Sequence, residues 1–239
     1  MTRTLLGMLT PSSNTVLEPV SSAMVAGLPE VSVHFGRFRV TEISLSEQAL
    51  AQFTDAEFLG AARLLADAQV QVIGWNGTSA GWKGFDADER LCAAITAATS
   101  IPACTSVLAL NELFALAGVR RMALVTPYID EVQRKIIANY AAIGIECVAE
   151  RHLGISHNFS FSEVDADRLR AMMRDVAQAR PQAIAVFCTN LRGGPLAAEM
   201  EAELGIPVFD SVATVMWKAL KLAGADPSRV AGWGRLFAL

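Results

Sequence analysis

Residues 7–11 read Gly-Met-Leu-Thr-Pro and residues 123–127 read Ala-Leu-Val-Thr-Pro, so an apolar run that ends in Thr-Pro occurs twice in the chain. Two further pairs of motifs follow in the same order: Asn-Gly-Thr-Ser at 76–79 with Phe-Cys-Thr-Asn at 187–190, and Ile-Pro-Ala-Cys-Thr-Ser at 101–106 with Ile-Pro-Val-Phe-Asp-Ser at 206–211. Their offsets are similar, at 116, 111 and 105 residues. Three matches in one order predict an internal duplication.

Short apolar or β-branched runs alternate with helical patterns along the chain. Strands are predicted at 4–9, 31–35, 70–75, 101–104, 121–125, 145–149, 183–187 and 207–209. One helix is expected to begin at a capping box of Thr54 and Glu57 and to bury the stripe that contains Phe58 and Leu65. Alternation of this kind is typical of parallel sheets covered by helices.

These patterns predict an α/β fold of two similar lobes related by a pseudo-twofold axis, with the active cleft between them. Each lobe is expected to hold a four-stranded parallel sheet flanked by helices. Residues 1–114 with 212–239 are assigned to the first lobe and 115–211 to the second. A last helix over 212–223 is expected to return to the first lobe.

Composition excludes several classes of protein. The 239 residues are 52% hydrophobic and 18% charged, and 20 basic against 24 acidic residues give a net charge of -4 without long runs of one sign. Binding to nucleic acid is therefore not expected. No apolar stretch approaches about 20 residues and the first ten residues lack a secretory pattern, so no membrane partner and a cytoplasmic location are expected. A homo-oligomer is left open.

No cofactor or metal is expected either. The four cysteines are widely spaced, the three histidines match no metal spacing, and the Gly-Gly-Pro and Gly-Trp-Gly motifs lack the rest of a nucleotide loop.

The repeated polar motifs all follow predicted strands. In open parallel sheets, ligands bind beyond the carboxyl ends of strands, where backbone N–H groups and hydroxyls can hold a carboxylate. We therefore expect a small carboxylate or dicarboxylate ligand. The candidate catalytic residues are Gly77, Thr78, Ser79, Tyr128 and Cys188, and the candidate binding residues are Thr10, Pro11, Ser12, Asn14, Asn76, Thr189 and Asn190.

Cys188 differs from the other three cysteines. Cys92 on a helix, Cys104 and Cys147 in strands are expected to be small buried hydrophobes. Cys188 lies in a turn close to a helix start, where the helix dipole favours a thiolate, although a thiol with a pKa of about 8.5 still stays mostly protonated at neutral pH.

Several other residues have two readings. Asn14 is either a helix cap or a ligand contact, and Tyr128 either a core tyrosine or, by a small margin, a cleft residue. Arg37 and Arg39 share one strand face, where a surface pair with Glu42 is favoured over a carboxylate clamp. Trp75 and Trp82 fit either core or pocket.

The chain resembles the aspartate/glutamate racemase superfamily, in the branch of maleate cis-trans isomerases and arylmalonate decarboxylases. Leu-Thr-Pro-Ser-Ser-Asn-Thr at 9–15 and Cys-Thr-Asn-Leu-Arg at 188–192 resemble the isomerases. Tyr-Ile-Asp at 128–130 and Gly-Trp-Gly-Arg-Leu-Phe at 232–237 resemble the decarboxylases. The resemblance implies cofactor-free chemistry by a cysteine from each lobe.

This sequence departs from the two-cysteine pattern, because Gly77 stands where the first cysteine would be. The decarboxylases share this departure, so the resemblance implies decarboxylation of a substituted malonate with protonation by Cys188. Thr78, Ser79, Tyr128 and backbone N–H groups would hold the enediolate. Restoring a thiol by Gly77→Cys is expected to introduce racemising ability.

The polar residues at 12–14 leave an isomerase or racemase acting on a small dicarboxylate as one alternative. A non-catalytic diacid-binding protein is the other.

Overall fold

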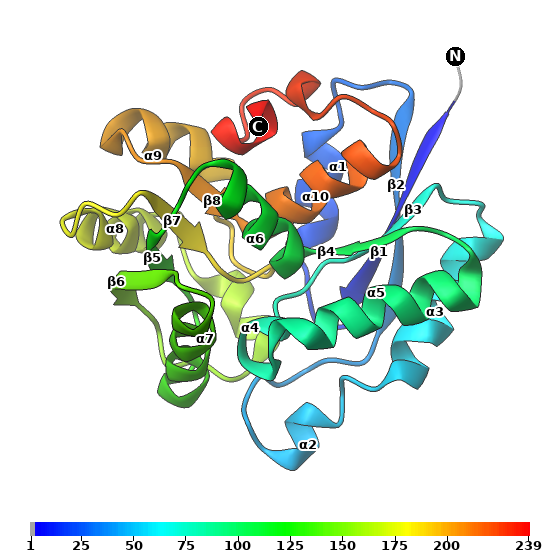
Figure 1. Ribbon diagram of the computed structural model, residues 1–239, viewed down its shortest axis with the longest axis horizontal. Helices are drawn as coiled ribbons and strands as arrows, with labels where there is room; N and C mark the ends of the chain where they lie inside the picture. Colours follow the sequence, from blue (N-terminus) through cyan, green and yellow to red (C-terminus); the bar gives the residue numbers. More distant parts are fainter. Residues whose placement is uncertain (1–2) are drawn as a thin grey trace.

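The computed structural model describes residues 3–239 as two four-stranded, all-parallel sheets that lie side by side (Figure 1). The strand orders are β2-β1-β3-β4 and β6-β5-β7-β8, so the same order occurs in both halves of the chain. The strands are β1 (Thr4–Pro11), β2 (Val31–Phe38), β3 (Val72–Trp75), β4 (Ala103–Thr105), β5 (Arg121–Val125), β6 (Glu146–Arg151), β7 (Ala183–Val186) and β8 (Val208–Asp210). The two-lobed α/β prediction is confirmed.

All eight predicted strands are present, and their ends differ by a few residues. β1 continues through Thr10 and Pro11, which pair with Arg37 and Phe38 of β2, although the sequence pattern placed them in a turn. β3 begins at Val72, two residues later than expected. Hydrogen bonds between strands, which local patterns do not reveal, set these ends.

Helices flank both sheets. They are α1 (Leu17–Met24), α2 (Glu47–Leu50), α3 (Asp55–Asp67), α4 (Ala80–Lys83), α5 (Phe85–Thr99), α6 (Ser106–Leu116), α7 (Asp130–Ala142), α8 (Ala166–Ala177), α9 (Ala197–Leu204) and α10 (Ser211–Leu222). Short 3₁₀ helices are η1 (Asn158–Glu163), η2 (Gly194–Leu196), η3 (Pro227–Arg229) and η4 (Arg235–Ala238). No helix in residues 3–239 is both long and apolar enough to cross a membrane.

Some helices begin with a side-chain capping hydrogen bond and others do not. α3 follows Thr54 and buries Phe58 and Leu65 as predicted, but the Thr54 side chain makes no capping hydrogen bond, so the predicted capping box is wrong. The acidic residues of its first turn still complement the helix dipole. In contrast, Asp210 caps α10 by accepting hydrogen bonds from the N–H groups of Val212 and Ala213 at 2.9 and 3.2 Å.

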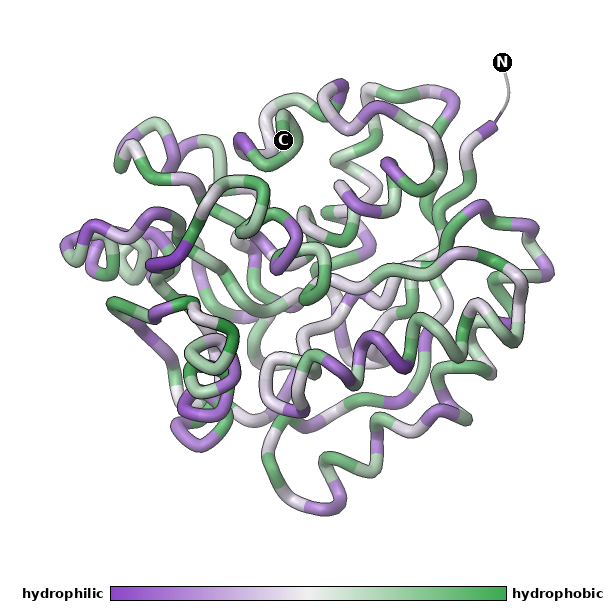
Figure 2. The backbone as a smooth tube through the Cα atoms, in the orientation of Figure 1, coloured by the Kyte–Doolittle hydropathy of each residue, from purple (hydrophilic) through white to green (hydrophobic). Residues whose placement is uncertain are grey.

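The strands carry much of the apolar core. β3, β7 and β8 are buried throughout, and β5 is buried except at its first residue. In Figure 2 hydrophilic residues recur along the outer helices α7 and α8. α6 and α10 pack on each other, and α10 also contacts β3, β4 and β8. We propose on this basis that α10 belongs to the first lobe; the full division at 114/115 and 211/212 stays a prediction.

The loops beyond the carboxyl ends of the two sheets meet and are joined by hydrogen bonds. Asn14 Nδ2 donates to Thr189 Oγ1 at 3.2 Å, and the Thr15 N–H donates to Asn190 Oδ1 at 3.0 Å. The segment after β2 joins the second lobe as well, because the Ile43 N–H donates to the Ser156 carbonyl at 2.8 Å. Loops from both repeats therefore lie against one another.

Candidate active site

A small buried cavity lies where these loops meet. Its volume is about 20 Å³, roughly the space of one water molecule. The lining residues are Pro11, Val40, Ile43, Phe53, Trp75, Gly77, Thr78, Ser79, Trp82, Tyr128, Asn158, Cys188 and Thr189. All five candidate catalytic residues and two of the candidate binding residues, Pro11 and Thr189, are among them.

Cys188 lies two residues after Val186, the end of β7, and is only 2% exposed. Burial raises the pKa of its thiol to about 12, while hydrogen bonds from the backbone N–H groups of Asn190 and Leu191 and from Tyr128 act in the opposite direction. The Asn190 N–H lies 3.4 Å from Sγ. The side chain is therefore a neutral thiol at physiological pH, which suits a proton donor.

The expected effect of a nearby helix start on Cys188 is wrong. The chain after Cys188 forms a turn and then the single-turn η2, and α9 begins only at Ala197. The helix dipole acts mainly within the first turn, so it does not lower the pKa of this thiol. Burial is the dominant influence instead.

Thr78 and Tyr128 place two hydroxyl groups in the cavity wall. Thr78 follows β3 and Tyr128 follows β5, and their oxygens lie 2.6 Å apart. Burial holds the pKa of Tyr128 well above its usual value, so the phenol stays neutral and keeps its proton. Tyr128 is thus buried and also lines the cavity, so it has features of both alternatives predicted from the sequence, a core tyrosine and a cleft residue.

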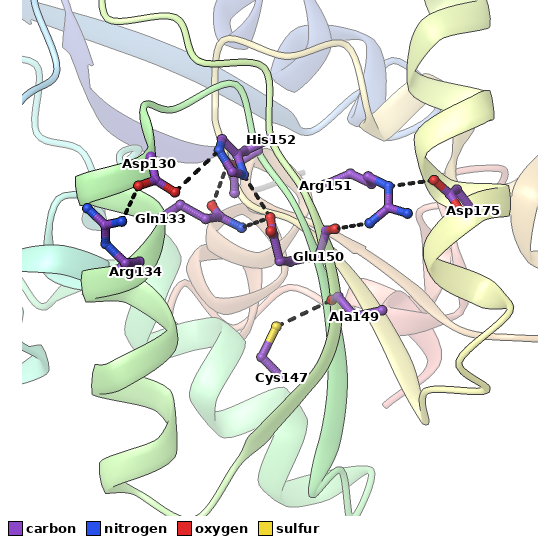
Figure 3. Close-up of polar contacts among 10 residues, drawn as sticks. Asp130, Gln133, Arg134, Cys147, Ala149, Glu150, Arg151, His152 and Asp175 are labelled. Atoms are coloured by element: carbon purple, nitrogen blue, oxygen red, sulfur yellow. Dashed lines mark hydrogen bonds and ion pairs between the residues drawn. The ribbon is translucent and has the colours of Figure 1, made fainter.

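A chain of hydrogen bonds fixes the turn that carries Tyr128. Thr126 Oγ1 donates to Gln133 Oε1 at 2.7 Å, and Gln133 Nε2 donates to Glu150 Oε2 at 2.9 Å. Glu150 Oε2 also contacts His152 Nδ1 at 2.8 Å (Figure 3). The Gly154 N–H donates to the Tyr128 carbonyl at 3.0 Å. Residues of α7 and β6 therefore hold the backbone turn from which the Tyr128 side chain extends.

One wall of the cavity is apolar and comes largely from the segment between β2 and α3. It consists of Val40, Ile43 and Phe53, and Trp82 adjoins it with its ring centroid 6.2 Å from that of Phe53. These three residues and Asn158 were not predicted from the sequence. The apolar residues at 38, 40 and 43 alternate only partly, which gives a weak signal for a cavity wall.

Five candidate binding residues do not line the cavity. Asn14 caps the start of α1, with Oδ1 accepting from the N–H groups of Val16 and Leu17 at 2.9 Å, so the capping interpretation is confirmed. Ser12 Oγ accepts from the Val40 N–H at 3.1 Å. The remaining three, Thr10, Asn76 and Asn190, are fully buried. Direct substrate contact by any of the five stays a prediction.

The favoured pair between Arg37 and Glu42 is wrong. Arg37 Nε donates to Glu18 Oε1 at 2.8 Å, and Nη1 donates to the carbonyls of Ser12 and Asn14 at 2.9 and 3.1 Å. Arg37 therefore braces the first strand-to-helix loop from outside. Arg39 is exposed and lines a separate open hollow of about 490 Å³ on the outer side of the same segment.

That open hollow offers little for catalysis, because it is lined mostly by polar residues without a thiol or a buried donor. Within residues 3–239, no three His, Cys, Asp or Glu side chains are grouped closely enough to hold a metal ion. The buried cavity around Cys188 is therefore the candidate active site.

The chain is similar to known proteins over most of its length. A family model described as arylmalonate decarboxylase matches residues 6–237. Arylmalonate decarboxylase from Bordetella bronchiseptica is 34% identical over 180 residues, which cover 74% of this chain and 75% of that protein. A solved arylmalonate decarboxylase superposes with a TM-score of 0.79 at 27% identity, covering 98% of this chain and 99% of the other.

A maleate isomerase is also similar. A variant of the Nocardia farcinica maleate cis-trans isomerase, solved with a covalently bound succinylcysteine intermediate, has a TM-score of 0.90 at 25% identity and covers 98% of both chains. The lobes and their arrangement are thus shared with both kinds of enzyme.

Proposed function

This chain belongs to the arylmalonate decarboxylase family, and from that premise we propose that it is a cofactor-independent enzyme that decarboxylates a substituted malonate and protonates the product through Cys188. One observation carries the choice of reaction. The cavity combines a single thiol with an apolar wall of Val40, Ile43 and Phe53. Decarboxylation needs only one proton donor, and an apolar wall keeps water away from the carbanion that loss of CO₂ leaves behind.

The polar residues that argued for a more polar substrate do not line the cavity. Ser12 and Ser13 bond to the backbone of Val40, and Asn14 caps α1. Arg37 is held by Glu18 and by loop carbonyls. The apolar wall is therefore available for an aryl or alkyl substituent on the malonate carbon.

In the first step the bond between the malonate carbon and the departing carboxylate breaks. The electron pair moves into the remaining carboxylate, giving an enediolate and CO₂. The hydroxyls of Thr78, Ser79 and Tyr128, with backbone N–H groups beside Cys188, would donate to the enediolate oxygens. The 2.6 Å contact between Thr78 and Tyr128 means that at least one hydroxyl turns from its partner to the substrate. A well-placed donor of this kind contributes about 3 kcal/mol to lowering the barrier.

In the second step the enediolate carbon takes the proton of the Cys188 thiol, and the electron pair returns from the oxygens to form the C–H bond. The resulting thiolate is then reprotonated from solvent. Because burial raises the pKa of this thiol to about 12, the thiolate strongly favours regaining its proton, which resets the site.

A second candidate is isomerisation of a small dicarboxylate, favoured by the similarity to the Nocardia farcinica isomerase. Gly77 supplies no thiol, so Cys188 would have to serve as the only sulfur nucleophile. The neutral, buried state of Cys188 disfavours that role, because the thiolate is the nucleophile.

Proton NMR in deuterated buffer with phenylmalonate, maleate and aspartate tests the proposal. We expect the parent protein to convert phenylmalonate to α-deuterated phenylacetate and CO₂, and Cys188→Ala to lose this turnover. Cys104→Ala is the matched control, because Cys104 is buried in β4 away from the cavity. Fumarate from maleate would favour the isomerase. Turnover of phenylmalonate by Cys188→Ala at the parent rate would refute the role of the thiol.

A further inference from the structure

Gly77 lies against the indole ring of Trp75, two residues earlier in the chain. A β-carbon built on Gly77 would overlap Cζ2 and Cε2 of Trp75 and would lie 2.5 Å from Cη2. Real β-carbons essentially never approach another heavy atom within 3.0 Å. The ring therefore occupies the volume that any side chain at position 77 would need.

Trp75 has little freedom to move aside. It is the last residue of β3 and is 1% exposed. Three phenylalanines surround its ring, with centroid distances of 4.9 Å to Phe58, 5.2 Å to Phe38 and 6.5 Å to Phe53. Rotation of the indole toward these rings would therefore displace them.

Packing alone holds this ring in place. Among residues 3–239, Trp75 Nε1 is buried without a hydrogen-bond partner. A smaller apolar residue at position 75 would therefore leave no further polar group unpaired. The steric effect of Trp75 can thus be separated from hydrogen bonding by substitution.

We propose that Trp75 is the residue that restricts this active site to a single thiol. The inference rests on the proposed function and deepens it. With Trp75 present, a proton can be delivered to the substrate carbon only from the Cys188 side, so the reaction is limited to one face. A cysteine at position 77 becomes functional only when Trp75 is also replaced by a residue with a smaller side chain. Under this proposal, Gly77→Cys alone does not create a racemase.

A double-variant cycle of Gly77→Cys and Trp75→Leu tests the inference by two readouts. The first is the melting temperature, which does not depend on any activity. We expect Gly77→Cys alone to lower Tm by more than about 5 °C, and the loss in the double variant to be clearly smaller than the sum of the two single losses. Gly60→Cys is the matched control, because a β-carbon there meets nothing within 4 Å, and its Tm should match the parent.

The second readout is deuterium exchange at the α-carbon of each enantiomer of 2-phenylpropionate. We expect exchange of both enantiomers to be at least tenfold faster in the double variant than in Gly77→Cys. If Trp75→Leu does not fold, Trp75→Phe, which keeps an aromatic ring but removes Cζ2 and Cη2 of the indole, takes its place in both readouts.

The inference is overturned if Gly77→Cys keeps the parent Tm and exchanges both enantiomers as fast as the double variant. It is also overturned if the double variant exchanges only one enantiomer while the parent decarboxylates phenylmalonate. Absence of decarboxylation in the parent would instead refute the proposed function. In that case the melting cycle alone decides whether Trp75 excludes a side chain at position 77.

Discussion

The hydroxyl oxygens of Thr78 and Tyr128 lie 2.6 Å apart, although the two residues follow strands of different sheets. The contact closes the cavity between the lobes and sets two neutral hydroxyls beside the Cys188 thiol. Separation of the lobes would separate these donors. Under the proposed function, the relative position of the two sheets therefore sets the geometry of these donors.

Tyr128→Phe is expected to lower kcat for phenylmalonate about 100-fold to 1000-fold, because one donor to the enediolate is lost. KM should change much less, since the donor acts mainly on charge that develops in the transition state. Steady-state kinetics measure both. Tyr140→Phe is the matched control: Tyr140 is equally buried, lies outside the cavity, and its hydroxyl has no hydrogen-bond partner within residues 3–239. A loss of less than about threefold in Tyr128→Phe would contradict the donor role.

The pH dependence of decarboxylation should reflect the buried state of Cys188. In the proposed mechanism the protonated thiol is the active form, and burial raises its pKa to about 12. Activity that depends on this group is therefore retained as pH rises through the ordinary thiol range and is lost only near pH 12. We expect kcat/KM for phenylmalonate to show no thiol-dependent fall between pH 7 and 10. A fall centred near pH 8.5 would show an ordinary thiol instead.

Phe53 is expected to limit the size of the substituent that the cavity accepts, because its ring forms part of the apolar wall. Phe53→Leu should raise the ratio of kcat/KM for 2-naphthylmalonate over phenylmalonate by about tenfold. Phe58→Leu is a matched control, since Phe58 is also buried but packs behind Trp75 and does not line the cavity. Equal ratios in the two variants would place the substituent elsewhere.

The fold could be predicted from the sequence because its signals are local and occur twice. The motif that ends at Pro11 lies in β1 and the motif that ends at Pro127 overlaps the end of β5, and these two strands hold the same place in sheets of the same order. Cys188 could be found for the same reason, since it follows β7 at the position that Gly77 occupies after β3. The predicted catalytic residues line one cavity because the carboxyl ends of parallel strands share an edge.

The remainder of the site depends on contacts between distant residues, which no local pattern reports. Asn14 caps its own helix and also reaches Thr189 in the other lobe. Arg37 pairs with Glu18 and not with Glu42, which is nearer in the sequence. The pairing of β1 with β2 places the Arg37 side chain over the loop that precedes α1. The wall residues Val40 and Phe53 lie in a segment with only one short helix, where periodicity is weak. The overlap between Trp75 and a side chain at position 77 likewise depends on how the indole ring packs in the fold, which the sequence does not reveal.

Asp88 provides a stability prediction outside the active site. It lies in the first turn of α5, is 2% exposed, and its Oδ2 has no hydrogen-bond partner within the described residues. Burial raises its pKa from 3.8 to about 7, against the opposing effects of the Thr105 hydrogen bond and the Lys83 charge. The native state therefore binds more protons than the unfolded state between these two pH values.

It follows that the free energy of unfolding contributed by Asp88 falls as pH rises from about 4 to about 7, by up to about 4 kcal/mol. Asp88→Asn removes this titration but can still accept from Thr105. We expect the Tm of Asp88→Asn relative to the parent to be higher at pH 8 than at pH 4, by several degrees. Thermal denaturation at both pH values measures this difference, in which the other titrating groups cancel.

Asp86→Asn is the matched control in the same turn. Asp86 is exposed, and its pairing with Arg90 holds its pKa below the usual value, so its contribution to stability is present at high pH and lost as pH falls. The Tm of Asp86→Asn relative to the parent should therefore be unchanged or lower at pH 8 than at pH 4, the opposite sign from Asp88→Asn. If both variants shift in the same direction, burial of the Asp88 carboxyl is not the cause.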